Sequence, residues 1–288
     1  MTLPQLKFVQ CLSPAGLHNM AYKQWGDPEN PNVLVCLHGL TRVSDDFDAL
    51  ARALCDTYRV VCPDVVGRGR SDWLRDPRYY MPQQYVCDMV TLLARLEAET
   101  VDWFGTSMGG LVGMGIAALP GNPVRKLLLN DVGASLHTAA LNRIGDYLAL
   151  PVRFTTFDQA LQYVRAISMP FGRHTDEEWR KLASDVLRQD HDGQWIFHYD
   201  PGLAIPFKAI TPEDAEQNAV ALAATYRAIA CETLLVRGAE SDLLTREVAQ
   251  EMTQEGPKAT LVEIPDVGHA PTFVHANQIA IAKDFFLG

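Results

Sequence analysis

The chain has 288 residues, of which 48% are hydrophobic and 21% are charged, a balance typical of a globular protein with a large core. Its 25 Lys and Arg residues against 35 Asp and Glu residues give a formal net charge of −10. A net acidic surface argues against nucleic acids and anionic membranes as partners, so we expect neither.

Six cysteines are present, and none of them forms a Cys-x-x-Cys pair: Cys11, Cys36, Cys55, Cys62, Cys87 and Cys231. Most lie in apolar runs, which predicts free buried thiols in a reducing compartment. The N-terminal residues contain no basic segment followed by an apolar stretch, and no apolar run reaches the ~18 residues of a membrane span. The sequence therefore predicts a cytoplasmic protein without a signal peptide.

Short apolar runs alternate with amphipathic helical patterns in the first half of the chain. The near-continuous apolar run at 32–37 is typical of a strand that is buried on both faces of a parallel sheet. Strands are predicted over 7–11, 19–24, 32–37, 58–62, 100–104 and 125–130. Helices are predicted over 47–55, 82–98 and 111–119.

The alternation of strands and helices stops after residue 132, where helical patterns follow one another without a strong strand. These helices are predicted over 139–150, 157–167, 176–187 and 212–229. Alternation then resumes, with strands at 233–236 and 259–264 and helices at 246–254 and 272–286. This order predicts an α/β fold with a mostly parallel sheet, formed by residues 1–132 and 231–288. Residues 133–230 are predicted to form a mostly helical cap, whose last helix could belong to the core.

The most informative motif is Gly105-Thr106-Ser107-Met108-Gly109, a Gly-x-Ser-x-Gly pattern between a predicted strand and a helix. Such a turn holds its serine in a strained conformation with the hydroxyl exposed, and the glycines allow strand and helix to approach closely. The motif therefore predicts that Ser107 is a nucleophile, which needs an adjacent base.

His269 is the best placed of the eight histidines to act as that base, because it lies in a short loop after the last predicted strand. The base must be held by an acceptor, for which Asp242 is the first choice, with Asp131 as the alternative acid. Both follow predicted strand ends, and the order Ser107, Asp242, His269 matches one of the known triad orders.

These pieces together resemble the α/β-hydrolase family, as a capped, esterase-like serine hydrolase. They comprise His38-Gly39, Asp64 with Gly67–Ser71, the motif at 105–109, the loop at 238–242 and Gly268-His269. The resemblance implies an eight-stranded sheet, a cap after the sixth strand, and an acid at either of the two candidate positions. It also implies an oxyanion hole made by the backbone N–H groups of Leu40 and Met108.

The substrate pocket is expected to include His38, Arg42 and Trp73. The alternative for His38 is that it only fixes the oxyanion loop. The alternative for Arg42 and Trp73 is that they lie in exposed loops. The sequence contains no His-x-x-x-His pattern, phosphate loop or dinucleotide fingerprint, so we expect neither a metal site nor a cofactor.

The resulting hypothesis is hydrolysis of a small, apolar carboxylic ester through a covalent acyl-enzyme. Carbon–carbon bond hydrolysis, lactone hydrolysis and perhydrolysis use the same residues in this family and remain alternatives. A non-catalytic small-molecule receptor on the same fold is a further alternative. The oligomeric state is left open.

Overall fold

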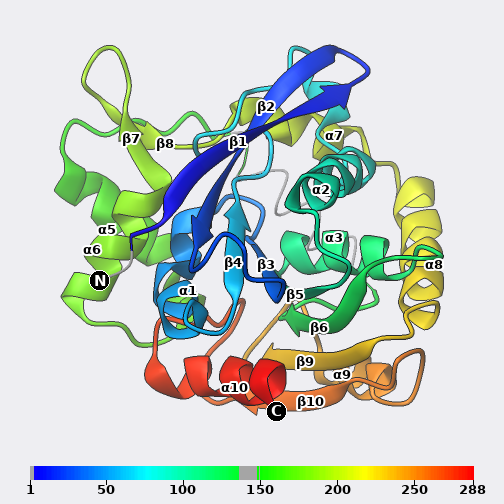
Figure 1. The fold of residues 1–288 in the computed structure, drawn as a ribbon. Helices are drawn as coiled ribbons and strands as arrows, with labels where there is room; N and C mark the ends of the chain where they lie inside the picture. The colour runs from blue at the N-terminus through cyan, green and yellow to red at the C-terminus, as the bar shows by residue number, and fades with distance from the viewer. Residues whose placement is uncertain (1–2, 136–147, 149) are drawn as a thin grey trace.

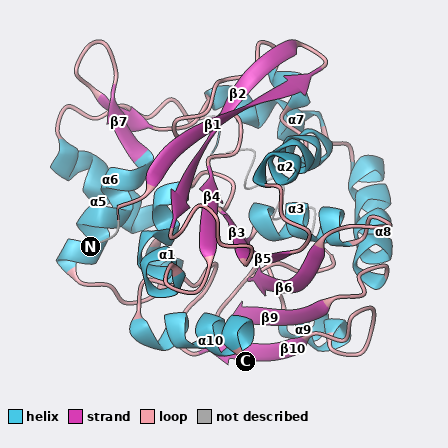
Figure 2. Ribbon diagram, in the orientation of Figure 1, coloured by secondary structure: helices cyan, strands magenta, loops and turns pink. Residues whose placement is uncertain are grey.

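An eight-stranded sheet forms the centre of the molecule (Figures 1 and 2). The computed structural model describes residues 3–135, 148 and 150–288. The strand order is β1-β2-β4-β3-β5-β6-β9-β10, with β2 antiparallel to both β1 and β4 and the other neighbours parallel. The strands are β1 (Gln5–Ser13), β2 (Gly16–Trp25), β3 (Val33–Leu37), β4 (Arg59–Pro63), β5 (Val101–Thr106), β6 (Val124–Asn130), β9 (Glu232–Gly238) and β10 (Thr260–Ile264). The predicted α/β class and mostly parallel sheet are confirmed.

Helices cover both faces of this sheet, which explains why its central strands are apolar throughout. All five residues of β3 are buried. Val33, Val35 and Leu37 point into one core, while Leu34 and Cys36 point into the other. The helices α1 (Asp48–Leu54) and α10 (Ala276–Leu287) contribute to the second core. The first core is packed by α2 (Pro82–Leu96), α3 (Met108–Ala117), α8 (Pro212–Arg227) and α9 (Arg246–Met252).

Between β6 and β9 the chain forms a separate apolar cluster around α5 (Phe157–Ile167) and α6 (Asp176–Val186). A short antiparallel hairpin of β7 (Leu187–Gln189) and β8 (Trp195–Phe197) follows, and then α7 (Ala204–Ala209). The remaining short elements are the 3-10 helices Ser44–Phe47, Pro77–Tyr79, Met169–Phe171 and Pro201–Leu203. None of the helices in the described part of the chain is long and apolar enough to cross a membrane.

The sequence analysis missed the β7–β8 hairpin, because strands of three residues are too short to show a periodicity of two. The helix predicted over 139–150 lies almost entirely outside the described residues. Tyr226 of α8 is buried in the main core, where its hydroxyl donates to the Met252 carbonyl at 2.6 Å. The division into a core and a cap stays a prediction.

The last helix begins at Ala276, four residues later than predicted. Phe273 has a φ of +55°, which a helix cannot accommodate, and its N–H is bound by the Gln278 side chain at 2.7 Å. An apolar pattern alone does not reveal such a side-chain cap.

Two glycines of the motif at 105–109 are required by the close approach of β5, α3 and β3. A Cβ atom at Gly105 would lie 2.4 Å from the Gly109 carbonyl oxygen, and one at Gly109 would lie 2.0 Å from that of Leu37. These neighbours are backbone atoms of packed elements, so they cannot move aside. Only glycine lets the start of α3 rest against the end of β3.

Charged side chains connect the segment between β6 and β9 to the turn after β3 and to α1. Arg42 forms a bidentate ion pair with Asp46 and also donates to the Leu182 carbonyl at 3.1 Å. Lys181 of α6 pairs with Asp185 at 2.7 Å and with Asp48 at 3.4 Å. Burial, reinforced by the nearby Asp46 charge, raises the pKa of Asp185 to about 6, although Lys181 acts in the opposite direction.

We predict that Gly109→Ala lowers the free energy of unfolding by ~3 kcal/mol or more, because the added methyl group overlaps the Leu37 carbonyl. Gly39→Ala is the matched control, since its Cβ would meet nothing nearer than Arg42 Cγ at 3.7 Å. This control should change stability by less than ~1 kcal/mol in urea denaturation. Equal stability of the two variants would contradict the packing argument.

Asp185→Asn should change how stability depends on pH. The folded-state pKa of about 6 lies above the unfolded value, so between pH 4 and 6 the folded state binds more protons. The contribution of Asp185 to stability is therefore present at low pH and is lost as the pH rises through 6. Relative to the wild type, the variant should gain up to ~3 kcal/mol in unfolding free energy between pH 4 and pH 7.

Denaturant titrations at the two pH values measure this difference. Asp56→Asn serves as the control, because Asp56 is exposed and its substitution should give the same difference from wild type at both pH values. A pH-independent difference for Asp185→Asn would show that its carboxyl is not perturbed.

Candidate active site

Ser107 lies at the sharp turn between β5 and α3, as the sequence predicted. Its backbone has φ 51° and ψ −115°, a region that is costly for a residue with a side chain. Its N–H donates to the Asn130 carbonyl at 2.9 Å, which holds the turn against the end of β6. The side chain is half-buried, so its hydroxyl is available at the carboxyl edge of the sheet.

His269 reaches Ser107 from the loop that follows β10. Its Nε2 atom lies 3.0 Å from Ser107 Oγ. The loop is fixed by two contacts: Gly268 N–H donates to the Pro170 carbonyl at 2.6 Å, and the Asn130 side chain donates to the Pro271 carbonyl at 2.8 Å. The predicted pairing of serine and imidazole is therefore present in the geometry.

Of the two candidate acids, the structure brings Asp131 next to His269. Asp131 Oδ2 lies 2.7 Å from His269 Nδ1, so the single hydrogen on that nitrogen is donated to Asp131, the alternative choice. Asp242, the first choice, is an exposed residue of the loop after β9. A different residue of that loop does contribute, because Ser241 Oγ donates to Asp131 Oδ2 at 2.6 Å.

Asp131 is completely buried, and its charge is stabilised by hydrogen bonds from three segments. Besides Ser241 and His269, the N–H of Gly238 donates to Oδ1 at 2.9 Å. Sequence reasoning singled out the loop at 238–242 but did not assign Gly238 or Ser241 as donors to the acid. The available signal was the position of Asp131 directly after β6, whose strand lies between β5 and β9.

Two backbone N–H groups were predicted to form an oxyanion hole. Met108 is the first residue of α3, where the helix leaves N–H groups without an intrahelical acceptor and concentrates partial positive charge. Leu40 lies in the turn after β3. A Cβ placed on its neighbour Gly39 would be 3.8 Å from Ser107 Cβ, so this turn lies against the serine.

His38 holds this turn rather than lining the expected pocket, because it is 1% exposed. The Val65 N–H donates to its Nε2 at 2.9 Å, so Nδ1 carries the hydrogen and donates to the Gly39 carbonyl at 2.7 Å. That carbonyl shares a planar peptide with the Leu40 N–H, so fixing one fixes the direction of the other. Burial lowers the pKa of His38, which keeps the ring neutral.

The other two expected pocket residues are engaged elsewhere. Arg42 is bound to Asp46 and Leu182, as described above, and its guanidinium lies 5.7 Å from the centre of the Phe171 ring. Trp73 is 42% exposed, and the Arg188 guanidinium lies 5.4 Å from its ring centre. Arg42 is therefore already paired, and Trp73 lines a pocket beside the turn between β1 and β2.

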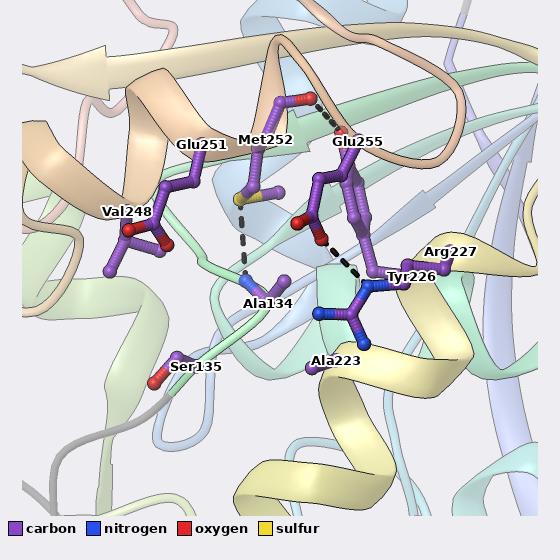
Figure 3. A pocket seen from close by; sticks show the side chains of 9 residues that line it. All are labelled: Ala134, Ser135, Ala223, Tyr226, Arg227, Val248, Glu251, Met252 and Glu255. Atoms are coloured by element: carbon purple, nitrogen blue, oxygen red, sulfur yellow. Dashed lines mark hydrogen bonds and ion pairs between the residues drawn. The ribbon is translucent and has the colours of Figure 1, made fainter.

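A cavity of about 90 Å³ lies between α8, α9 and the segment after β6 (Figure 3). The Arg227–Glu255 ion pair at 2.7 Å closes one side of it. Its lining residues are Ala134, Ser135, Ala223, Tyr226, Arg227, Val248, Glu251, Met252 and Glu255. Ser107 and His269 are not among them, so this cavity is separate from the candidate site.

One buried group, Cys11, His18 and Asp88, brings potential metal-ligand atoms within 4.8 Å of one another. The His18–Asp88 hydrogen bond of 3.0 Å already engages two of these side chains. Burial and the neighbouring Asp88 raise the pKa of Cys11 to about 12, whereas a metal ligand must be a thiolate. The cluster is explained as a hydrogen-bonded contact between β1, β2 and α2.

Comparison with known proteins places this geometry in a family. The chain is 61% identical to the 3-hydroxybutyrate-oligomer hydrolase of Cupriavidus necator, over 99% of this chain and 98% of that protein. It is 26% identical to the 2-hydroxymuconate semialdehyde hydrolase of Pseudomonas putida, over 80% of this chain and 77% of that protein.

Among solved structures, a putative hydrolase from Rickettsia typhi superposes with a TM-score of 0.89 at 29% identity. The match covers 98% of this chain and 99% of that one. Residues 34–282 match the family model described as "Alpha/beta hydrolase family". The predicted hydrolase class is confirmed, and the chain belongs to the α/β-hydrolase family.

Proposed function

We propose that the protein hydrolyses esters with Ser107 as nucleophile, His269 as general base and Asp131 as the acid that orients it. The observation that carries this proposal is the continuous chain of hydrogen bonds from Ser107 Oγ to His269, at 3.0 Å, and from His269 to Asp131, at 2.7 Å. A serine hydroxyl becomes an effective nucleophile only beside such an oriented base.

In the first step, Ser107 Oγ attacks the ester carbonyl carbon while its proton passes to His269 Nε2. The carbonyl oxygen becomes an oxyanion, which the N–H groups of Leu40 and Met108 stabilise. Asp131 stabilises the imidazolium that forms. Collapse of this intermediate breaks the ester C–O bond, and His269 returns the proton to the leaving alcohol, which leaves an acyl group on Ser107.

In the second step, water attacks the acyl-enzyme and gives its proton to His269. The second oxyanion accepts hydrogen bonds from the same two N–H groups. Its collapse breaks the bond to Ser107, which recovers a proton from His269, and the carboxylic acid leaves. One water is consumed and one ester is converted to an acid and an alcohol, so the enzyme is unchanged.

For the substrate we propose a short oligoester of a hydroxy acid. The support is the 61% identity, across nearly the whole length of both chains, to a protein named 3-hydroxybutyrate-oligomer hydrolase. Carbon–carbon bond hydrolysis receives no comparable support, because Arg42, the cation suggested for a substrate carboxylate, is already paired with Asp46. The six free cysteines favour a reducing compartment, so we place the activity in the cytoplasm.

A fluorophosphonate probe should label Ser107 covalently, and the wild-type protein should release monomer from 3-hydroxybutyrate trimer. Mass spectrometry of the labelled peptide and chromatography of the products measure the two outcomes. Ser107→Ala removes the nucleophile and should abolish both. A wild-type protein that binds the trimer without releasing acid would instead be a receptor.

Asp131→Asn should lower kcat for ester hydrolysis by roughly 10⁴-fold, because the amide cannot hold the imidazole in its working tautomer. Asp242→Asn is the matched control and should leave kcat within about threefold, since that carboxyl is exposed whereas Asp131 is completely buried beside His269. Steady-state kinetics with a nitrophenyl ester compare the two. The reverse order of effects would assign the acid to Asp242.

A further inference from the structure

Arg68 is a fully buried cation beside the candidate active site. Its side chain lies in the loop after β4 and has 0% exposure. Its Nε donates to the Leu40 carbonyl at 2.9 Å, and Nη1 donates to the Val66 carbonyl at 2.8 Å. Nη2 lies 3.4 Å from the sulfur of Met108. The guanidinium therefore contacts both residues whose N–H groups would hold the oxyanion.

The charge of Arg68 has no partner carboxylate within ion-pair distance in the described part of the chain. Its nearest aromatic neighbours are the rings of Tyr85, with a centre 4.8 Å away, and Tyr80, at 5.9 Å. Burial raises the pKa of both phenols, so they are neutral. An arginine does not lose its proton in proteins, so Arg68 keeps its positive charge in the interior without a direct ion pair.

An unpaired buried charge is costly, and it is retained where it has a use. The neighbouring arginine shows the contrast, because Arg70 is partly exposed and pairs with Asp45 at 2.5 Å and with Asp64 at 3.5 Å. Arg70 is thus neutralised two residues away, while Arg68 is not. Two charges develop during ester hydrolysis: the imidazolium of His269, which is paired with Asp131, and the oxyanion, which would be held by the two residues that Arg68 contacts.

We propose that Arg68 is a positioning residue that stabilises the oxyanion through its unpaired positive charge, without touching the substrate. This inference rests on the proposed function of Ser107. The 2.9 Å contact with the Leu40 carbonyl and the covalent geometry of that residue place the guanidinium within roughly 10 Å of the oxyanion position. A unit charge at roughly 10 Å, at an effective dielectric constant of about 20, changes the rate by roughly 15-fold.

A purely structural role makes a different prediction. In that case Arg68 only ties the loop at 67–69 to the Leu40 turn, and its loss would weaken every ligand alike. The charge, by contrast, acts on the anionic tetrahedral state alone. A trifluoromethyl ketone analogue of the ester separates the two roles. Ser107 adds to its carbonyl with proton transfer to His269, which leaves an alkoxide in the oxyanion hole. The matching secondary alcohol binds without forming an anion.

The experiment measures inhibition constants for both ligands and kcat/KM for a nitrophenyl ester in wild type, Arg68→Met, Arg68→Lys and Arg70→Met. For Arg68→Met, we expect ketone affinity and kcat/KM to fall by roughly 15-fold, with alcohol affinity unchanged within about threefold. Arg68→Lys keeps the charge but loses the planar donor geometry, and should retain hydrolysis within about tenfold. Arg70→Met should behave as wild type.

An equal loss of affinity for ketone and alcohol in Arg68→Met, or no loss for either, would overturn the inference. If Arg68→Met does not fold, Arg68→Lys decides: a structural tie predicts that it loses hydrolysis as well, whereas the charge predicts retention. The proposed function is tested separately, because it fails only if the wild-type protein neither hydrolyses the ester nor forms the ketone adduct.

Discussion

The buried carboxylate of Asp131 is the interaction on which the candidate site depends. It accepts hydrogen bonds from the Gly238 N–H, the Ser241 hydroxyl and the His269 ring, so it joins the ends of β6 and β9 to the loop after β10. A carboxylate with no exposure is tolerable only when its lone pairs are satisfied in this way. The same bonds that stabilise the charge therefore also fix the imidazole beside Ser107.

The residues of the candidate site can meet because the strands that carry them are neighbours in the sheet. β5, β6, β9 and β10 are successive neighbours, so the residues that follow them emerge along one edge. Glycines permit the final approach. A Cβ at Gly238 would lie 2.2 Å from the Gly268 carbonyl, just as one at Gly109 would overlap Leu37. The site therefore depends as much on missing side chains as on the reactive ones.

The sequence was sufficient to predict the fold and the pairing of Ser107 with His269, because periodicity and strand ends are local features. It could not choose between the acids, since Asp131 and Asp242 both follow a buried strand. Their difference is one of burial: Asp131 is completely buried and accepts from the Gly238 N–H across the β6–β9 pair, while Asp242 is exposed. The role of Arg68 was equally hidden, because its missing counter-charge is a property of packing and not of the motif around it.

His38 and Arg68 show how the interior treats two cationic residue types differently. Both lie behind the turn that carries Leu40, and both bind its backbone carbonyls. Burial lowers the pKa of His38, so it serves as a neutral brace with a fixed tautomer. Arg68 does not lose its proton, so its positive charge remains in spite of the same burial. A neutral brace fixes the direction of the Leu40 N–H, while a permanent charge sets the potential there, and an oxyanion site benefits from both.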